Sequence, residues 1–193
     1  MYEIRLHGRG GQGVVKASQL VVKAAVAGGL YGQSIPAFGV ERKGSPVFGY
    51  LRLSHTPIRR KMQVYEPDIL VILDDTLITS TGTYAGLKEG GMIIINTKKR
   101  ADQLHVPKAA KTIVTVDATG ISEKFLGSNR PNTAMLGAFV AATQLVDAGR
   151  PLSFPRRLDA GSLFSEIEAA FGAANRQAAE TAAASLVITS GSF

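Results

Sequence analysis

The first 28 residues carry the pattern that most constrains the fold of this chain. Residues 2–7 alternate as strand residues do, and they run into the hexapeptide GRGGQG at residues 8–13. Residues 12–28 then place apolar side chains at helical spacing and end on a glycine pair. A strand, a glycine-rich turn and a helix in this order are typical of α/β folds.

The remainder of the chain continues this alternation of strands and helices. We predict strands at residues 46–54, 69–73, 91–96 and 112–119. We predict helices at residues 76–88, 120–127 and 132–148, and one or two alanine-rich helices within 162–188. The run ILVIL at 69–73 is wholly apolar, which is typical of a parallel strand that is buried on both faces.

Two further segments complete the predicted fold. Residues 32–45 contain three glycines and a proline and are predicted to form a loop. Residues 58–64 are predicted to return as the hairpin partner of 46–54. The sequence therefore predicts one Rossmann-like α/β domain over residues 1–193, with a mostly parallel sheet, an inserted β-hairpin and a helical C-terminus.

Positive charge is concentrated in the first third of the chain. The net charge of +7 comes from 22 basic and 15 acidic residues. Residues 1–61 hold ten of the basic residues but only Glu3 and Glu41 as acids, so their net charge is +8 and that of the remainder is −1. This asymmetry indicates either an anionic partner, such as a phosphate-bearing ligand, a nucleic acid or an acidic protein, or a basic face that contacts only water.

The glycine-rich turn is the first candidate site. Gly8, Gly10 and Gly13 match the pattern GxGxxG, and backbone N–H groups in such a turn can approach a phosphate closely at the positive end of a helix. The predicted anion-binding residues are Gly8, Arg9, Gly10, Gly11, Gln12 and Gly13. No acid lies about 20 residues further on, which weakens a nicotinamide dinucleotide interpretation. Alternatively, the glycines serve only close packing of strand and helix.

The second candidate site is the charged, glycine-bearing loop FGVERKGSP at residues 38–46. Glycine makes a loop costly to order, so a loop of this composition often has a function, here as an interface or a ligand clamp. The alternative is a surface loop with a Glu41–Arg42 pair of little energetic weight.

The chain lacks a self-sufficient catalytic set. It has no cysteine, so it offers neither a thiolate nucleophile nor cysteine ligands for zinc or an iron–sulfur cluster. Its three histidines, His7, His55 and His105, are scattered, and we predict no metal site. Asp74, Asp75 and Asp117 follow predicted strands, where they either face a ligand or cap the next helix.

Composition and patterning also narrow the expected setting of the protein. No apolar run approaches the roughly 18 residues that span a bilayer, and the N-terminus lacks the layout of a secretory signal. We therefore expect a cytoplasmic protein with no membrane partner. No helix carries a basic stripe and no aromatic stacking pattern occurs, so we expect no nucleic-acid partner.

Four segments carry a family resemblance. They are GRGGQG, PAFGVERKGSPV, PIRRKMQVYEPDILVILD and NTAMLGAF, and they occur in this order within about residues 2–145. Together they resemble the γ subunit of 2-oxoacid:ferredoxin oxidoreductases, most closely the pyruvate/ketoisovalerate members. Val40, Lys43 and Ser45 stand where Pro, Arg and Ala are usual in the family.

The resemblance implies a non-catalytic chain of a larger enzyme. In this family the α and β chains hold thiamine diphosphate, and β and a ferredoxin-like δ chain hold [4Fe–4S] clusters. The reaction is oxidative decarboxylation of a 2-oxoacid to an acyl-CoA, or its reversal, with ferredoxin as the electron acceptor. The γ chain is associated with coenzyme A.

The resemblance also assigns roles to the two candidate sites. It implies that the residues of GRGGQG bind a coenzyme A phosphate. The second loop, with Phe38, Gly39, Glu41, Arg42, Lys43 and Gly44, would meet the active centre or a partner chain. The alternative that we retain is a stand-alone Rossmann-type nucleotide-binding enzyme.

Overall fold

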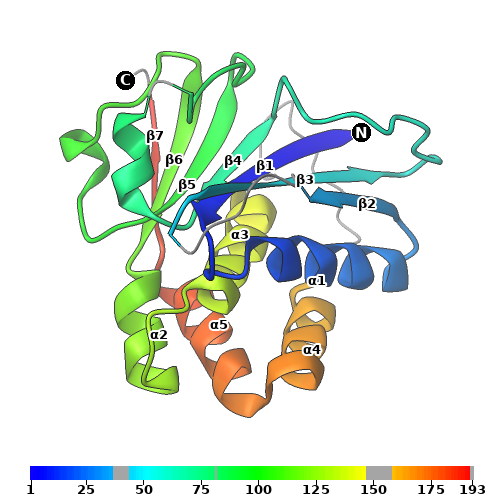
Figure 1. The fold of residues 1–193 in the computed structure, drawn as a ribbon, viewed down its shortest axis with the longest axis vertical. Coiled ribbons are helices and arrows are strands. Elements are labelled where there is room, and N and C mark those ends of the chain that lie inside the picture. The colour runs from blue at the N-terminus through cyan, green and yellow to red at the C-terminus, as the bar shows by residue number, and fades with distance from the viewer. Residues whose placement is uncertain (37–43, 81, 147–157, 192–193) are drawn as a thin grey trace.

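The computed structural model describes residues 1–36, 44–80, 82–146 and 158–191 of the chain. Within these ranges it contains one seven-stranded sheet, five α-helices and two short 3₁₀-helices (Figure 1). The strands are β1 (Tyr2–Arg9), β2 (Tyr31–Pro36), β3 (Pro46–Ser54), β4 (Ile69–Ile72), β5 (Gly91–Asn96), β6 (Ala110–Val116) and β7 (Val187–Ser190). The helices are α1 (Val14–Ala27), η1 (Asp75–Thr79), η2 (Ala101–Gln103), α2 (Ala118–Leu126), α3 (Asn132–Val146), α4 (Ala160–Phe171) and α5 (Ala173–Ser185).

The sheet is parallel at its centre and antiparallel at both edges. Its strand order is β2-β3-β1-β4-β5-β6-β7. The central strands β1, β4, β5 and β6 run parallel to one another, whereas β3, β2 and β7 pair antiparallel with their neighbours. The predicted α/β class, with a parallel sheet centre and a helical C-terminal part, is confirmed, and the antiparallel edges make the sheet mixed.

The α-helices all cover one face of the sheet, and loops with the two 3₁₀-helices cover the other (Figure 1). Val71 and Ile94 point into the helix-covered core, whereas their neighbours Leu70, Ile72 and Ile93 belong to the core on the opposite face. Because both faces of these strands are buried, β4 is apolar at every position and β5 is apolar up to its last residue, Asn96.

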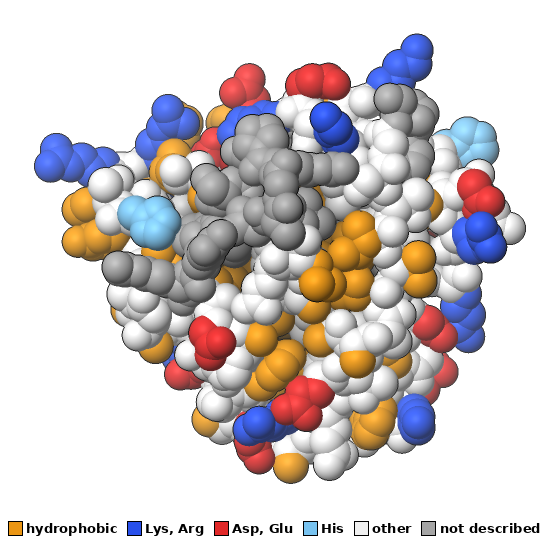
Figure 2. All heavy atoms as spheres, turned by 180° about the vertical axis from the view of Figure 1, so that it is seen from behind, with side chains coloured by type: hydrophobic (Ala, Val, Ile, Leu, Met, Phe, Trp, Pro, Cys, Tyr) orange, Lys and Arg blue, Asp and Glu red, His pale blue; other side chains and the backbone are white. Residues whose placement is uncertain are grey.

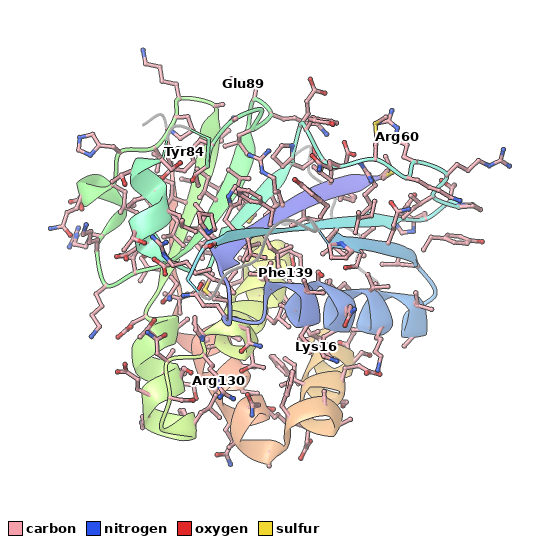
Figure 3. All side chains as sticks on the ribbon, in the orientation of Figure 1. Lys16, Arg60, Tyr84, Glu89, Arg130 and Phe139 are labelled. Carbon is pink, nitrogen blue, oxygen red and sulfur yellow. The ribbon has the colours of Figure 1, made fainter. Side chains whose placement is uncertain are left out.

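Helix α3 is the most deeply buried helix of the described chain. Its side chains from Ala134 to Val140 are all almost inaccessible, including Phe139, which Figure 3 places between the sheet and the lower helices. At Gly137 an added Cβ would overlap the carbonyl oxygen of Ala179 in α5. The close approach of α3 and α5 therefore depends on glycine at this position. Burial on all sides explains why residues 134–140 of the helix are apolar throughout.

The strand predicted at residues 46–54 does form a hairpin, but the prediction of residues 58–64 as its partner was wrong. β3 pairs with β2, which lies in the segment predicted to be a loop, and its other edge pairs with β1. Residues 58–64 cannot pair with β3 because both of its edges are occupied. Instead, the carbonyl oxygens of Met62 and Gln63 accept hydrogen bonds from the side chain of Arg52.

One helix prediction was also wrong, whereas the prediction of helices in the C-terminal segment was confirmed. The helix predicted over 76–88 is only the short 3₁₀-helix η1 followed by turns. Gly86 has a positive φ of 74°, and the carbonyl groups of Thr83 and Ala85 accept hydrogen bonds from Arg5 rather than from a following helical turn. The C-terminal segment forms two helices, as allowed, but it also adds the unpredicted edge strand β7.

Candidate functional site

The glycine-rich turn joins the end of β1 to the start of α1 at the centre of the sheet. Gly13 caps the helix with a positive φ of 77°, a conformation that glycine adopts without strain. Gly8 is required for a different reason, because an added Cβ would lie 2.5 Å from Cγ2 of Val14 in the first turn of the helix. The glycines therefore serve close strand–helix packing, as one interpretation held, and they also expose the backbone of the turn.

The first turn of α1 has N–H groups for which the described part of the chain offers no capping side chain. Gly13 has no side chain, and no side chain of the described residues caps the helix. The first intrahelical bond of this turn is donated by the N–H of Ala17 to the carbonyl oxygen of Gly13. The N–H groups of Val14, Val15 and Lys16 therefore precede the helical hydrogen-bond ladder, and they add to the partial positive charge of the helix end.

Asp74, at the end of β4, braces the turn from the neighbouring strand. Its carboxylate lies 3.2 Å from Nε of Arg9 and accepts hydrogen bonds from Nε2 of Gln12 at 3.0 Å and from the N–H and hydroxyl of Thr76. Partial burial opposes ionisation, but the hydrogen bonds from Thr76 and Gln12 and the charge of Arg9 outweigh it and lower the pKa of Asp74 below its ordinary value. Asp74 is thus held as an anion, and its capping role is confirmed.

The predicted anion ligand Arg9 is occupied within this brace. Its guanidinium donates hydrogen bonds to the hydroxyl of Thr76 at 2.6 Å and to the carbonyl oxygen of Gly44 at 3.1 Å. The side-chain amide of Gln12 also folds back, because its oxygen accepts from the N–H of Arg9 at 2.8 Å. In this arrangement both side chains shape the turn, and the backbone N–H groups of Arg9, Gly10 and Gln12 already have acceptors within the protein. The N–H groups at the start of α1 are therefore the donors that face a ligand.

The structure brings the two sequence motifs together. The N–H of Gly10 donates to the carbonyl oxygen of Ser45 at 2.8 Å, and the N–H of Gly44 donates to that of Gly10 at 3.2 Å. Gly44 is therefore joined directly to the glycine-rich turn. Phe38, Gly39, Glu41, Arg42 and Lys43 lie outside the described residues.

One side of the turn opens into a cleft with acidic groups, which we call the acidic cleft. It has a volume of about 430 Å³ and lies at the carboxyl ends of β4, β5 and β6. Asp74, Asp75 and Asp117 line it, together with Lys98 and Lys99. The carboxylate of Asp117 accepts a hydrogen bond from the N–H of Gly120, which confirms its role as the cap of α2. Three carboxylates against two lysines make this cleft unfavourable for a polyanion.

The other side of the turn opens into a cleft with basic groups, which we call the basic cleft. It has a volume of about 610 Å³, and its walls include Gly11, Gly13, Lys16, Phe125, Arg130 and Phe171. Figure 3 shows Lys16 at the start of α1 and Arg130 beyond α2, on the helix side of the sheet. No carboxylate is among the residues that line it, and within the described chain neither cation forms an ion pair. Lys16 and Arg130 were not among the predicted site residues.

His7 is excluded from acid–base chemistry near neutral pH. It is almost fully buried on β1, where Nε2 accepts a hydrogen bond from Nε of Arg5 at 2.9 Å and the ring packs edge-on against Phe48. Burial and, second, the charge of Arg5 lower the pKa of His7 to about 3. His7 is therefore a buried, hydrogen-bonded residue near the end of β1. Among the described residues, no group of three or more potential ligands is placed to hold a metal ion.

Comparison with known proteins gives one family. The family model described as "Pyruvate ferredoxin/flavodoxin oxidoreductase" matches residues 3–185. The "Pyruvate/ketoisovalerate oxidoreductases common subunit gamma" of Thermococcus kodakarensis is 47% identical over 148 residues, which are 76% of this chain and 80% of the relative. The "Pyruvate synthase subunit PorC" of Methanothermobacter marburgensis is 48% identical over 146 residues, with the same shares of each chain.

Solved structures agree with these relatives. The pyruvate oxidoreductase subunit PORC of Thermotoga maritima matches with a TM-score of 0.77 at 32% identity and covers 97% of this chain and 98% of its own. The 2-oxoglutarate:ferredoxin oxidoreductase of Magnetococcus marinus, solved with 2-oxoglutarate, coenzyme A and succinyl-CoA bound, matches with a TM-score of 0.71 at 17% identity. It covers 95% of this chain and 30% of its own, and at this identity the match shows a shared fold. None of the helices in the described ranges has the length and apolarity to cross a membrane.

Proposed function

The chain belongs to the pyruvate ferredoxin/flavodoxin oxidoreductase family as a γ subunit, and we propose that it binds coenzyme A through the glycine-rich turn and the basic cleft. In this proposal the phosphates lie at the start of α1, beside the turn formed by Gly8, Arg9, Gly10, Gly11, Gln12 and Gly13. Coenzyme A enters as the acyl acceptor in the oxidative decarboxylation of a 2-oxoacid, which we take to be pyruvate.

The observation that carries the ligand assignment is that one cleft combines two features. Within the described ranges, the start of α1 has no side-chain cap, and Lys16 and Arg130 form no ion pair. Coenzyme A has a diphosphate and a 3′-phosphate, so it requires several positive groups. The N–H groups at the start of α1 suit one phosphate, and Lys16 and Arg130 add full charges beside them. Phe125 and Phe171 supply ring surface on which an adenine base can pack.

The remaining cofactors are assigned to partner chains. This chain has no cysteine, so it cannot hold an iron–sulfur cluster through cysteine ligands. We propose that α and β subunits hold thiamine diphosphate, which supplies the decarboxylation chemistry when bound, and that β and δ subunits hold [4Fe–4S] clusters that pass electrons to ferredoxin. The role of this chain is to bind and orient coenzyme A and to complete the assembly.

The second motif fits this role through its contact with the turn. Gly44 is hydrogen-bonded to Gly10 and accepts from Arg9, so a ligand that moves the turn also moves the end of the second loop. We propose that the loop residues Phe38, Gly39, Glu41, Arg42, Lys43 and Gly44 meet the active centre or a partner chain.

Calorimetric titration of coenzyme A into the purified complex tests the ligand assignment. Lys16→Glu and Arg130→Glu place a negative charge in the basic cleft, whereas Lys98→Glu places one in the acidic cleft as the matched control. A lost charge-assisted phosphate contact corresponds to roughly a ten- to hundredfold weaker Kd, and we expect this for the first two variants only. An unchanged Kd for both, or an equal loss in Lys98→Glu, would contradict the assignment.

The same titration with dephospho-coenzyme A identifies which phosphate each cation meets. Dephospho-coenzyme A lacks the 3′-phosphate, so a variant whose lost contact is with that phosphate binds it as the wild type does. A variant whose lost contact is with the diphosphate is weakened for both ligands.

A further inference from the structure

A charged segment far from both clefts is not used by the proposed function. Residues 55–66, which we call the arm, connect β3 to β4 without forming a helix or strand, and ten of these twelve residues are exposed. In Figure 1 the arm extends beyond the sheet beside the N-terminus. It includes the basic run Arg59, Arg60 and Lys61, and none of its residues lines either cleft.

The arm is fixed to the sheet despite its exposure. Arg52 on β3 is 1% exposed, and its guanidinium donates to the carbonyl oxygens of Met62 at 2.6 Å and Gln63 at 3.0 Å. The same group is paired with Glu3 at 2.8 Å. Val64 then inserts its side chain into the protein with 1% exposure. The arm therefore presents one defined surface, and a partner that binds it has little ordering entropy to overcome.

The exposed surface of the arm combines positive charge with apolar side chains. Arg59, Arg60 and Lys61 are exposed, and within the described ranges none of them forms an ion pair. Met62 is 57% exposed and Tyr65 is 66% exposed beside them. Figure 3 shows Arg60 at the outer edge of the molecule, and Figure 2 shows basic side chains projecting from this edge next to hydrophobic atoms.

We propose that the arm is a docking surface for an acidic face, with an apolar centre, on another chain of the same oxidoreductase. Arginine, tyrosine and methionine are the residues in which protein interfaces are enriched, and Arg and Tyr dominate interface hot spots. Three adjacent cations complement carboxylates, which set the register and the rate of association. The inference rests on the proposed function, because it requires that this chain assemble with partner chains.

Nucleic acid fits this surface less well. Affinity for a duplex comes mainly from many contacts between cations and phosphates, whereas the arm offers three cations. Tyr65 is its single Phe, Tyr or Trp, so it also lacks a series of aromatic rings on which bases could stack. A phosphate-bearing small molecule is also unfavourable, because the arm projects from the surface instead of enclosing a cleft.

The test uses the complex assembled by co-expression with its partner chains. The arm variant is Arg59→Glu/Arg60→Glu/Lys61→Glu. The matched control, Lys98→Glu/Lys99→Glu/Arg100→Glu, reverses three other consecutive exposed cations. Native mass spectrometry measures how much of this chain stays in the complex as salt rises from about 0.05 to about 0.5 M, a range over which surface charges become screened. Thermal unfolding of each isolated variant confirms that it is folded.

We expect the arm variant to dissociate with roughly a ten- to hundredfold higher Kd and a flatter salt dependence than the wild type, while the control assembles normally. Carbodiimide should also couple Lys61 to an Asp or Glu of another chain. Three outcomes would overturn this inference and leave the proposed function intact. They are equal assembly of the arm variant and the wild type, coupling of Lys61 to a second copy of this chain and to no other chain, and a variant that loses nucleic-acid binding but assembles normally. A wild-type chain that assembles with no partner would overturn the proposed function as well.

Discussion

Replacing Arg52 with Met is the sharpest test of how the arm and the sheet are held together. Arg52 is 1% exposed and donates hydrogen bonds to Glu3, Gln33, Met62 and Gln63. Methionine keeps much of the volume but leaves the Glu3 carboxylate without its 2.8 Å partner and removes the donors to two carbonyl groups. Removing one member of a buried ion pair, so that the other charge stays buried without its partner, lowers the free energy of unfolding by about 3–5 kcal/mol.

The surroundings of Glu3 place the expected loss near the lower end of that range. Nζ of Lys88 lies 3.7 Å from the Glu3 carboxylate and retains part of the compensating charge. We therefore expect Arg52→Met to lose about 3 kcal/mol of the free energy of unfolding, which for a chain of this size lowers Tm by roughly 6–12 °C. Urea unfolding of the isolated chain, followed by circular dichroism, measures the loss, and trypsin should cleave at Arg59, Arg60 or Lys61 faster than in the wild type.

The neighbouring substitution Arg59→Met is the matched control, because it changes the same residue type on the exposed arm. Its effect should stay within about 0.5 kcal/mol. In the double variant Glu3→Gln/Arg52→Met the orphaned charge is gone, so part of the lost stability should return. A loss below about 1 kcal/mol in Arg52→Met, or no recovery in the double variant, would refute the reasoning.

Three further predictions follow from the described contacts. Folding lowers the pKa of Asp74, so its ionised form stabilises the protein at pH values above its ordinary pKa of 3.8, and this contribution is lost as pH falls through the lower folded value. Asp74→Asn should therefore reduce the dependence of stability on pH in the acid range. It should also weaken coenzyme A binding in a titration. Folding lowers the pKa of His7 from 6.5 to about 3, so between these pH values the unfolded chain binds a proton that the folded chain does not. The free energy of unfolding should therefore decrease as pH falls from about 6.5 toward 3, by up to about 1.4 kcal/mol per pH unit. An equally steep decrease in His7→Gln would contradict this. Gly137→Ala should force α3 and α5 apart and cost about 1–3 kcal/mol or more, whereas Gly82→Ala, where an added Cβ meets nothing within 4 Å, should leave Tm unchanged.

The strands β4 and β5 could be predicted because burial on both faces gives them nearly continuous apolar sequences. The region around β3 could not be predicted in the same way. The structure of this region depends on which strands occupy the two edges of β3. It also depends on the side chain of Arg52, which forms hydrogen bonds with residues up to 49 positions away. Local patterns in residues 58–64 carry no information about these long-range contacts.

In the candidate site, too, the features set by local sequence could be predicted and those set by long-range contacts could not. The strand, turn and helix of GRGGQG are local, and GxGxxG identified them. For Asp74 the sequence left two roles open, facing a ligand or capping the next helix. It gave no sign of the contact with Arg9, because that contact exists only once β4 lies beside β1. Arg130 is separated from Lys16 by more than a hundred residues, and only the packing of α2 and α5 below α1 brings both into the basic cleft. No sequence signal marks such a pair in one chain.

Purification of this chain from native extract under mild conditions, with mass spectrometry of the chains that accompany it, tests the central claim most directly. The account predicts thiamine-binding and iron–sulfur chains in near-equal amounts and a complex that oxidises a 2-oxoacid only when coenzyme A is present. Recovery of the chain alone, or with proteins that lack these cofactors, would contradict the assignment as a working γ subunit.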